Sequence, residues 1–408
     1  MQKKQGNNSG VALRAGLWYT VCNFIDKGLV FLTTPIFTRL LTKSVIGDFS
    51  NYTVWLTLVT YVVTMDMHVT ISRARFDYKE NLNQYISSIT ILSFLSTCAL
   101  SMVMLLFHEP ILKFVGIDMR MFVIMMSTIA FSGSFQIFQI EHRVHYKYKT
   151  FTMMTLLLSV STIVLSLILI KLMPDQLMGR ILGYSIPRWL IYVVLFVLLI
   201  YRGRCLKWEH CKYCFKICIP YIPHLLSLYI LSASDRAMIK MFQGSEEVAL
   251  YSIGYTCAMI VTILGNSMNQ AWSPWLTERL HEGSFQAIRK WSMRYFALFM
   301  LLVTAVGFIA PEMLLFMGGK SYASAVYVLP PVMAGCIFQF AYTMYVNIET
   351  YEKKTGRMAL ATMAGTLVNV ILNYIFIPKY GYVAAAFTTL VGYGILFIAH
   401  FGAVKKLK

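Results

Sequence analysis

Long apolar stretches recur along the whole of this 408-residue chain, and they constrain its fold more than any other feature. Each stretch is about 20 residues long, which is enough for a helix to cross the hydrocarbon core of a bilayer. With 58% hydrophobic and 13% charged residues, the composition is far from that of a soluble domain. Because lipid offers no partners to backbone polar groups, the pattern predicts an all-α polytopic membrane protein.

The apolar pattern predicts about 12 transmembrane helices. We expect them at residues 15–38, 46–71, 85–107, 121–140, 151–171, 181–200, 217–239, 248–272, 292–310, 326–348, 358–377 and 382–404. With the N-terminus inside, most of the 36 Lys and Arg residues fall in inner loops and tails, which predicts that both termini are cytoplasmic. This topology accounts for the net charge of +18, so we expect no nucleic-acid partner.

The predicted helices divide into two groups of six. Residues 1–200 are expected to form an N-terminal bundle and residues 217–408 a C-terminal bundle, joined by a basic cytoplasmic linker at 201–216. The linker has the composition of an amphipathic helix that lies on a membrane surface. Its His210, Cys211 and Cys214 have a spacing seen in zinc sites, but no second Cys pair accompanies them, so we expect no metal.

A short internal repeat links the two groups. Residues 38–50 align with residues 239–252 with one extra residue in the second copy, so that Arg39 matches Lys240. Since each half has six spans, the copies have the same orientation. This arrangement predicts a pseudo-two-fold axis along the membrane normal and a binding site between the halves.

Charged residues inside spans are the main candidates for function. Asp235 and Arg236 lie in the seventh span, where each charge costs roughly 2.5–3.5 kcal/mol to insert. Arg236 and Lys240 are four residues apart and share a helix face, so an anion is expected between them. The anion is either a neighbouring carboxylate, which is a structural interpretation, or a substrate phosphate, which is a functional one.

Other polar residues in or near the spans complete the set of candidates. Asp66 needs a partner at the inner end of the second span, and Arg73 or Arg75 is within reach. The remaining candidates are cations, a carboxylate and amides: Lys27, Arg39, Arg188, Asp26, Asn269, Gln270, Asn369 and Asn373. The amides are expected to line an interior or glycan-binding surface.

Several segments together resemble the bacterial polysaccharide (O-antigen type) lipid-linked oligosaccharide flippases, of the multidrug/oligosaccharidyl-lipid/polysaccharide exporter superfamily. They are residues 16–20, 33–42, 234–239, 249–255 and 269–275, of which Asp-Arg at 235–236 and Asn-Gln-Ala-Trp-Ser-Pro-Trp at 269–275 are the more specific. The resemblance implies two six-helix bundles that carry an undecaprenyl-pyrophosphate-linked repeat unit across the plasma membrane by alternating access, for surface polysaccharide biosynthesis. It also implies membrane lipids and polysaccharide assembly proteins as partners, and no cofactor.

The family's cavity is cationic, and the resemblance assigns roles to the candidate residues accordingly. Arg39, Arg236 and Lys240 best fit the site for the substrate headgroup, with Lys27 and Arg188 as further candidates. The carboxylates Asp26, Asp66 and Asp235 would hold these cations in place or take part in ion coupling.

Two other functions would place different demands on the sequence. A drug or cation antiporter of the same superfamily would need unpaired carboxylates in an acidic, aromatic cavity. A membrane-embedded polymerase or acyltransferase would need a general base or an activated nucleophile, and no such constellation stands out in the sequence. We therefore expect a transporter rather than an enzyme.

Arg236→Ala tests the functional interpretation of the seventh span. Because a guanidinium can bind a pyrophosphate group through paired hydrogen bonds, its loss is expected to abolish export while the protein still inserts normally. The measurement is surface polysaccharide in cells that carry the variant as their only copy, beside the amount of protein in the membrane. Wild-type polysaccharide would remove Arg236 from the mechanism.

Overall fold

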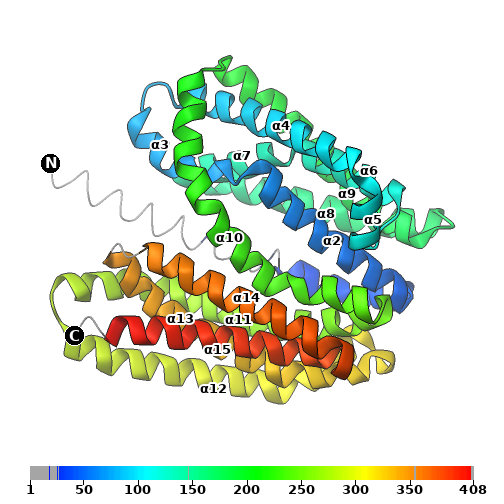
Figure 1. Cartoon of the computed structure of the whole chain (residues 1–408), viewed down its shortest axis with the longest axis vertical. Helices are drawn as coiled ribbons and strands as arrows, with labels where there is room; N and C mark the ends of the chain where they lie inside the picture. Colours follow the sequence, from blue (N-terminus) through cyan, green and yellow to red (C-terminus); the bar gives the residue numbers. More distant parts are fainter. Residues whose placement is uncertain (1–17, 19–24, 26, 146, 353–354, 406–408) are drawn as a thin grey trace. The chain divides into compact units, whose positions relative to one another are not determined.

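The structure is a computed structural model, and it describes residues 18, 25, 27–145, 147–352 and 355–405. Within these residues all regular secondary structure is helical (Figure 1). The predicted all-α fold is therefore confirmed. Asp26, one of the candidate carboxylates, lies outside the described residues.

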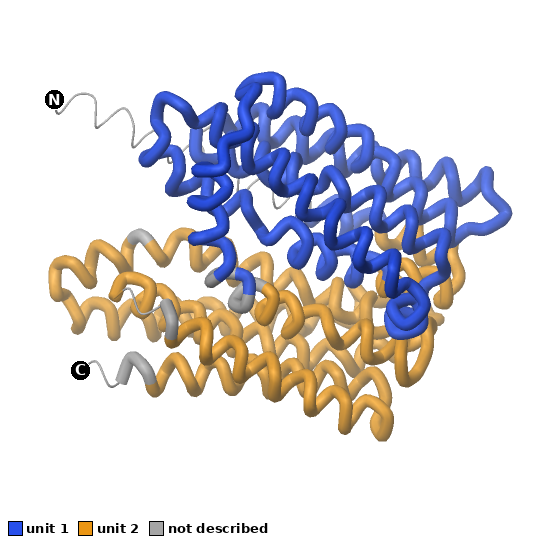
Figure 2. The backbone as a smooth tube through the Cα atoms, turned by 45° about the horizontal axis from the view of Figure 1, so that its top comes forward, with its two compact units in different colours: residues 1–33, 52–222 blue, residues 34–51, 223–408 orange. Residues whose placement is uncertain are grey.

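The chain forms two compact units (Figure 2). Unit 1 comprises Met1–Thr33 and Tyr52–Ile222, and unit 2 comprises Thr34–Asn51 and Pro223–Lys408. The chain changes unit inside three helical segments, which are residues 27–40, α2 (Lys43–Thr64) and α10 (Trp208–Phe242). Since α10 is continuous, residues 208–216 of the expected linker are the start of the helix that carries the seventh span. The division into 1–200, 201–216 and 217–408 stays a prediction.

The other helices follow in chain order. Unit 1 contains η1 (Met67–Thr70), α3 (Ile71–Asp77), α4 (Leu82–Leu106), α5 (His108–Val115), α6 (Met119–Ala130), α7 (Ser132–Val144), α8 (Tyr148–Leu172) and α9 (Gln176–Gly203). Unit 2 contains α11 (Ser245–His281), α12 (Phe285–Gly318), η2 (Lys320–Val328), α13 (Leu329–Tyr351), α14 (Thr355–Tyr380) and α15 (Tyr382–Lys405).

The length and hydropathy of these helices fit a chain that crosses a membrane many times. Among the described residues, nine helical segments are long and apolar enough to span, or ten if the bent pair Lys43–Thr64 and Met67–Asp77 is one span. The expected span at 15–38 lies partly outside the described residues, and the expected span at 217–239 lies within α10.

Large apolar side chains are exposed along the outside of these helices. Phe308 on α12 is 80% exposed and Leu106 on α4 is 75% exposed. Exposure of many such side chains would be unfavourable in water, and it is the normal state of helices that face lipid tails. The protein is therefore a multi-pass membrane protein.

The interior of unit 1 includes cysteines from the first part of α10. Cys214 and Cys218 pack in a buried cluster that joins η1, α3, α4, α7, α8, α9 and α10. His210 is buried as well, with its Nδ1 atom 2.9 Å from the Ser88 hydroxyl oxygen, and burial lowers the pKa of its imidazole. The stripe of cysteines is thus a packing surface. No group of three metal-ligating side chains occurs in the part of the chain that the structure describes.

Small residues let neighbouring helices in unit 1 approach closely. Gly183 on α9 faces Ser166 on α8, and a Cβ atom at position 183 would overlap the Ser166 backbone. Gly394 on α15 is a useful contrast, because no other side chain or neighbouring backbone lies within 4 Å of a Cβ built there. Close approach through small residues is a common way for helices to associate in a membrane, where water does not drive them together.

Gly183→Val tests this packing. The extra side chain must push α8 and α9 apart, so we expect a loss of about 1–3 kcal/mol in the free energy of unfolding. The matched variant Gly394→Val is expected to stay within about 0.5 kcal/mol of the wild type. Thermal unfolding of the detergent-solubilised protein measures both. Equal stability of the two variants would contradict the close α8–α9 contact.

Candidate functional site

Asp235 lies at the centre of a buried polar network in unit 2. It is located on α10, and none of its surface is exposed. Its Oδ1 atom accepts a hydrogen bond from Asn373 Nδ2 at 2.7 Å, and its Oδ2 atom accepts one from Thr389 Oγ1 at 2.6 Å. The Tyr251 hydroxyl also donates to Oδ2. Donors on α11, α14 and α15 therefore converge on one carboxylate.

A second layer of hydrogen bonds holds these donors. Asn373 also donates to Asn369 Oδ1 at 3.3 Å, and Thr388 donates to Asn373 Oδ1. Asn369 in turn donates to Thr389 Oγ1 at 3.5 Å. The two asparagines are four residues apart, so they face the same side of α14. The structure thus brings together three of the candidate residues, Asp235, Asn369 and Asn373.

The hydrogen bonds to Asp235 come from uncharged donors. A carboxylate that is removed from water is stabilised by hydrogen bonds, but its full charge still favours a positive partner. Among the described residues no Lys, Arg or His forms an ion pair with Asp235. The oxygen atoms of Asp235, Asn369 and Thr389 are ligands of the kind that hard cations prefer.

Arg236 is adjacent in sequence but lies on another face of α10. Its guanidinium carbon is 4.8 Å from the centre of the Tyr255 ring, which is a cation–π contact. Its Nε atom is buried and has no hydrogen-bond partner among the described residues. A buried guanidinium N–H without an acceptor is unfavourable, and an anionic ligand would satisfy it.

Lys240 has a different environment. Its ammonium group contacts Asp48 and Ser245, and Ser245 Oγ donates to Asp48 Oδ1 at 2.6 Å. These contacts join the two copies of the repeat within unit 2, where Ser50 Oγ and Ser252 Oγ are 2.7 Å apart. The anion beside Lys240 is thus a neighbouring carboxylate, which favours the structural interpretation for this residue.

The other candidate cations have different surroundings. Lys27 and Arg39 are both exposed on a helical segment at residues 27–40. Arg188 is half-buried and lines a polar pocket in unit 1. Of Arg39, Arg236 and Lys240, only Lys240 forms an ion pair with a described carboxylate.

Asp66 lies where α2 ends, at a bend of 52° between Lys43–Thr64 and Met67–Asp77. Met65 and Asp66 both have positive φ values, which side chains other than glycine rarely adopt. The Asp66 carboxylate is 3.7 Å from His68 Nδ1. The expected partners bind elsewhere, since Arg73 pairs with Asp77 and Arg75 donates to the Val144 carbonyl. The prediction of an Arg73 or Arg75 partner was therefore wrong.

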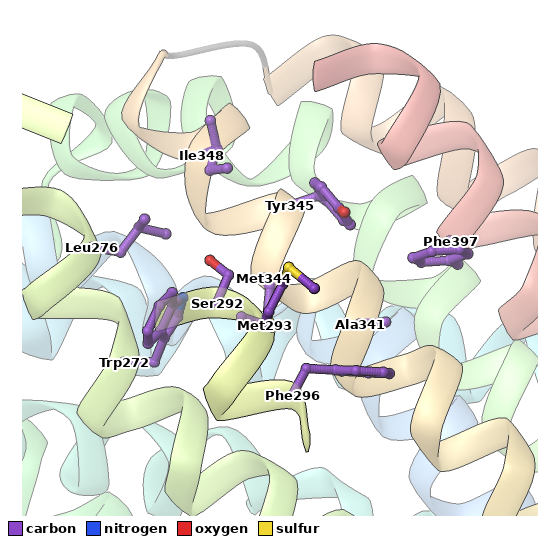
Figure 3. Close-up of a pocket in the computed structure, with 10 residues that line it drawn as sticks. All are labelled: Trp272, Leu276, Ser292, Met293, Phe296, Ala341, Met344, Tyr345, Ile348 and Phe397. Carbon is purple, nitrogen blue, oxygen red and sulfur yellow. The ribbon is translucent and has the colours of Figure 1, made fainter. Parts of the chain in front are cut away.

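Amide and aromatic side chains of α11 line two further pockets in unit 2. Asn269 accepts a hydrogen bond from Asn347 at 2.7 Å and lines a small pocket, whereas Gln270 is exposed. A larger, apolar pocket of ≈ 220 Å³ lies between α11, α12, α13 and α15 (Figure 3). Trp272 and Phe296 line it, and Trp272 stacks on Tyr295 at 5.0 Å.

The sequence did not single out all of the buried polar residues. It missed Tyr251, Thr388 and Thr389 of the Asp235 network, because Tyr and Thr are ordinary residues in spanning helices. It also missed Glu349, which is fully buried and contacts His400 at 3.0 Å and Arg357 at 3.2 Å. Glu349 directly follows the expected span at 326–348, and a carboxylate at the end of a span was the one sequence feature that pointed to it.

Comparisons of the sequence identify related families. The family model described as "Polysaccharide biosynthesis protein" matches residues 12–279, and the model described as "MatE" matches residues 220–375. Two proteins of Haemophilus influenzae are similar over 86% of this chain. An "Uncharacterized membrane protein" is 24% identical and matched over 86% of its length, and "Lsg locus putative protein 1" is 22% identical and matched over 88%.

Solved structures share the fold. "Lipid II flippase MurJ, inward closed conformation" has a TM-score of 0.75 and 14% sequence identity, covering 95% of this chain and 87% of that chain. The inward-facing conformation of a multidrug resistance MATE family transporter has a TM-score of 0.67 and 13% identity, covering 95% and 94%. At such identities the likeness concerns the fold alone.

Tyr251→Phe tests the Asp235 network. The change removes one O–H donor from a buried carboxylate and leaves the ring, so we expect a loss of about 1–3 kcal/mol in the free energy of unfolding. Tyr327→Phe is the matched control, because Tyr327 is 67% exposed and should tolerate the same change. Thermal unfolding in detergent compares them. Two variants of equal stability would count against the bond to Asp235.

Proposed function

The chain belongs to the polysaccharide biosynthesis protein family, and from that premise we propose that it translocates polyprenyl-pyrophosphate-linked oligosaccharide repeat units across the bacterial plasma membrane. It is a membrane transporter of the multidrug/oligosaccharidyl-lipid/polysaccharide exporter superfamily, not an enzyme. The proposed lipid carrier is undecaprenyl pyrophosphate, and the proposed product pathway is that of a surface polysaccharide.

The surroundings of Arg236 are the main support for the proposed function. This guanidinium lies in a membrane helix, stacks on Tyr255, and has a buried N–H group with no acceptor among the described residues. A pyrophosphate oxygen would supply that acceptor together with the compensating negative charge. The arrangement supports binding of an anionic headgroup during transport.

The Asp235 network supports a second part of the proposal, that transport is coupled to a cation or a proton. Donors from α11, α14 and α15 meet one carboxylate of α10. A cation or proton on the carboxylate would neutralise its charge and weaken the hydrogen bonds that these donors make to it, so occupancy would change which arrangement of the helices is favoured. Arg236 follows Asp235 directly, so the occupancy of the network would affect the headgroup site.

The proposed topology follows from the distribution of charge. With both termini in the cytoplasm, most Lys and Arg residues face the inner side, as expected for a bacterial inner-membrane protein. The substrate would enter from the cytoplasmic leaflet, where its sugars are assembled, and leave to the outer leaflet. Polysaccharide assembly proteins are the proposed partners on the outer side.

Reconstituted vesicles test the proposal directly. We expect the purified chain to move a fluorescent polyprenyl-pyrophosphate oligosaccharide between leaflets faster than protein-free vesicles do. Asp235→Asn is expected to lower the rate at least about tenfold and to remove its dependence on an imposed sodium or proton gradient, since the variant carries no charge to neutralise. Asp118→Asn, at the exposed N-terminus of α6, is the matched control and should leave both properties unchanged.

Vesicles in which the lipid moves no faster with the protein than without it would overturn the proposed function. Normal gradient dependence in Asp235→Asn would overturn only the coupling site.

A drug exporter is the second candidate, and the apolar pocket of unit 2 is the observation that favours it. Trp272, Phe296 and Met344 line a cavity of ≈ 220 Å³ suited to an apolar ligand (Figure 3). The match to the MatE family covers the same part of the chain. In that case the vesicles would move an apolar dye and not the lipid-linked oligosaccharide.

A further inference from the structure

Unit 1 contains a polar pocket that the proposed headgroup site does not include. Its volume is ≈ 290 Å³, and α2, α6, α7, α8 and α9 contribute to its wall. The side chains that carry its chemistry are Thr57, Gln136, Gln139, Ser159, Tyr184 and Arg188. A polar pocket among membrane helices is costly to maintain, because its amide and hydroxyl groups need partners.

Arg188 is held in a fixed orientation at this pocket. It follows Pro187 on α9, and its Nη1 atom donates to Thr162 Oγ1 at 2.9 Å and to the Tyr184 carbonyl at 2.8 Å. The guanidinium also lies 3.4 Å from the centre of the Tyr184 ring. With Nη1 engaged in this way, the ring stacking and the two bonds orient the planar group before any ligand arrives.

The charge of the pocket indicates what it would bind. Among the described residues that line it, Arg188 is the one cation and none is a carboxylate. Among the described residues no acidic side chain forms an ion pair with Arg188, unlike Arg202, which is 3.6 Å from Glu141 in the same unit. One guanidinium matches one carboxylate in charge and through paired hydrogen bonds.

The other side chains that line the pocket can form hydrogen bonds with the hydroxyl groups of a sugar. Gln136 and Gln139 each present an amide donor and an acceptor. Thr57 uses its proton on the Thr53 carbonyl, which leaves its oxygen as an acceptor. The rings of Tyr184 and Tyr192 supply flat apolar surface. The volume is at the lower end of the roughly 300–1,000 Å³ found for small-molecule sites, which suits one ring rather than a whole repeat unit.

We propose that this pocket binds a sugar ring that carries a carboxylate, with Arg188 on the carboxylate and the two glutamines on the ring hydroxyls. The inference rests on the proposed function and extends it, since it makes an acidic sugar part of the transported oligosaccharide. Arg188 then selects the glycan, and Arg236 holds the pyrophosphate.

Thermal unfolding of the detergent-solubilised full-length chain tests the pocket with defined probes: D-glucuronate, D-glucose and inorganic pyrophosphate. A tenfold excess of glucuronate over its Kd is expected to raise the unfolding midpoint by about 3 °C, and glucose should not. Arg188→Ala should abolish the shift, and Arg188→Lys, which keeps the charge, should retain part of it. Arg120→Ala is the matched control, because Arg120 is 71% exposed and pairs with Asp118 away from the pocket.

Three results with the two sugars would overturn the inference: no shift with glucuronate, an equal shift with glucose, or a glucuronate shift that persists in Arg188→Ala. A shift with pyrophosphate that depends on Arg188 would assign the pocket to the headgroup instead, which also overturns it. Gln136→Ala provides a second variant that keeps the charge and should weaken the glucuronate shift.

Transport in vesicles separates this inference from the function on which it rests. Two polyprenyl-pyrophosphate lipids are compared, one carrying glucose and one carrying glucuronate. Arg188→Ala is expected to lower the ratio of glucuronate-lipid to glucose-lipid transport about tenfold, because it removes the charge-assisted hydrogen bonds to the sugar carboxylate. An unchanged ratio with active transport overturns only the acidic-sugar site. Failure of both lipids to move in the wild type overturns the proposed function.

Discussion

A carboxylate buried among hydrocarbon side chains is stable only when nearby donors or a cation compensate for its charge, and Asp235 is in that position. Its partners Tyr251, Asn373 and Thr389 come from three different helices, so the network also determines how α10, α11, α14 and α15 pack in unit 2. Packing and charge are therefore coupled at one residue. A change in the charge of that carboxylate would alter every helix contact made through it, which is the property that an ion-coupled transporter requires.

Cationic side chains of this chain differ in whether a negative charge lies next to them. Lys240 faces Asp48 and joins the two copies of the repeat, so its charge is already balanced. Arg236 meets an aromatic ring and retains a buried N–H group without an acceptor among the described residues. Arg188 donates to uncharged oxygens, and no carboxylate is among the described residues that line its pocket. Structural and ligand-binding roles thus differ in what lies within a few ångströms of each cation, not in the cation itself.

The helices of this chain were predictable because their apolar pattern repeats along the sequence. Contacts between distant parts of the chain were not predictable. The apolar stretches predicted the helices, and the spacing of Asn369 and Asn373 placed both on one face of α14. The partner of Lys240 was not predictable as Asp48, since 192 residues separate them. Tyr251 and Thr389 were missed for the same reason, because nothing near either residue in sequence indicates Asp235. Asp66 was recognised as unusual, but the bend that removes it from Arg73 and Arg75 depends on positive φ values that no sequence period reveals.

In the proposed transport cycle, the guanidinium of Arg236 meets the phosphorylated head of a lipid-linked glycan inside the membrane. Electron cryo-microscopy of the full-length chain in lipid nanodiscs, with a polyprenyl-pyrophosphate oligosaccharide added, would show whether this contact forms. We expect density for the pyrophosphate within hydrogen-bonding distance of Arg236, with the Asp235 network intact beside it. Density for the pyrophosphate elsewhere, with Arg236 still stacked on Tyr255 and without a ligand, would show that Arg236 does not hold the headgroup.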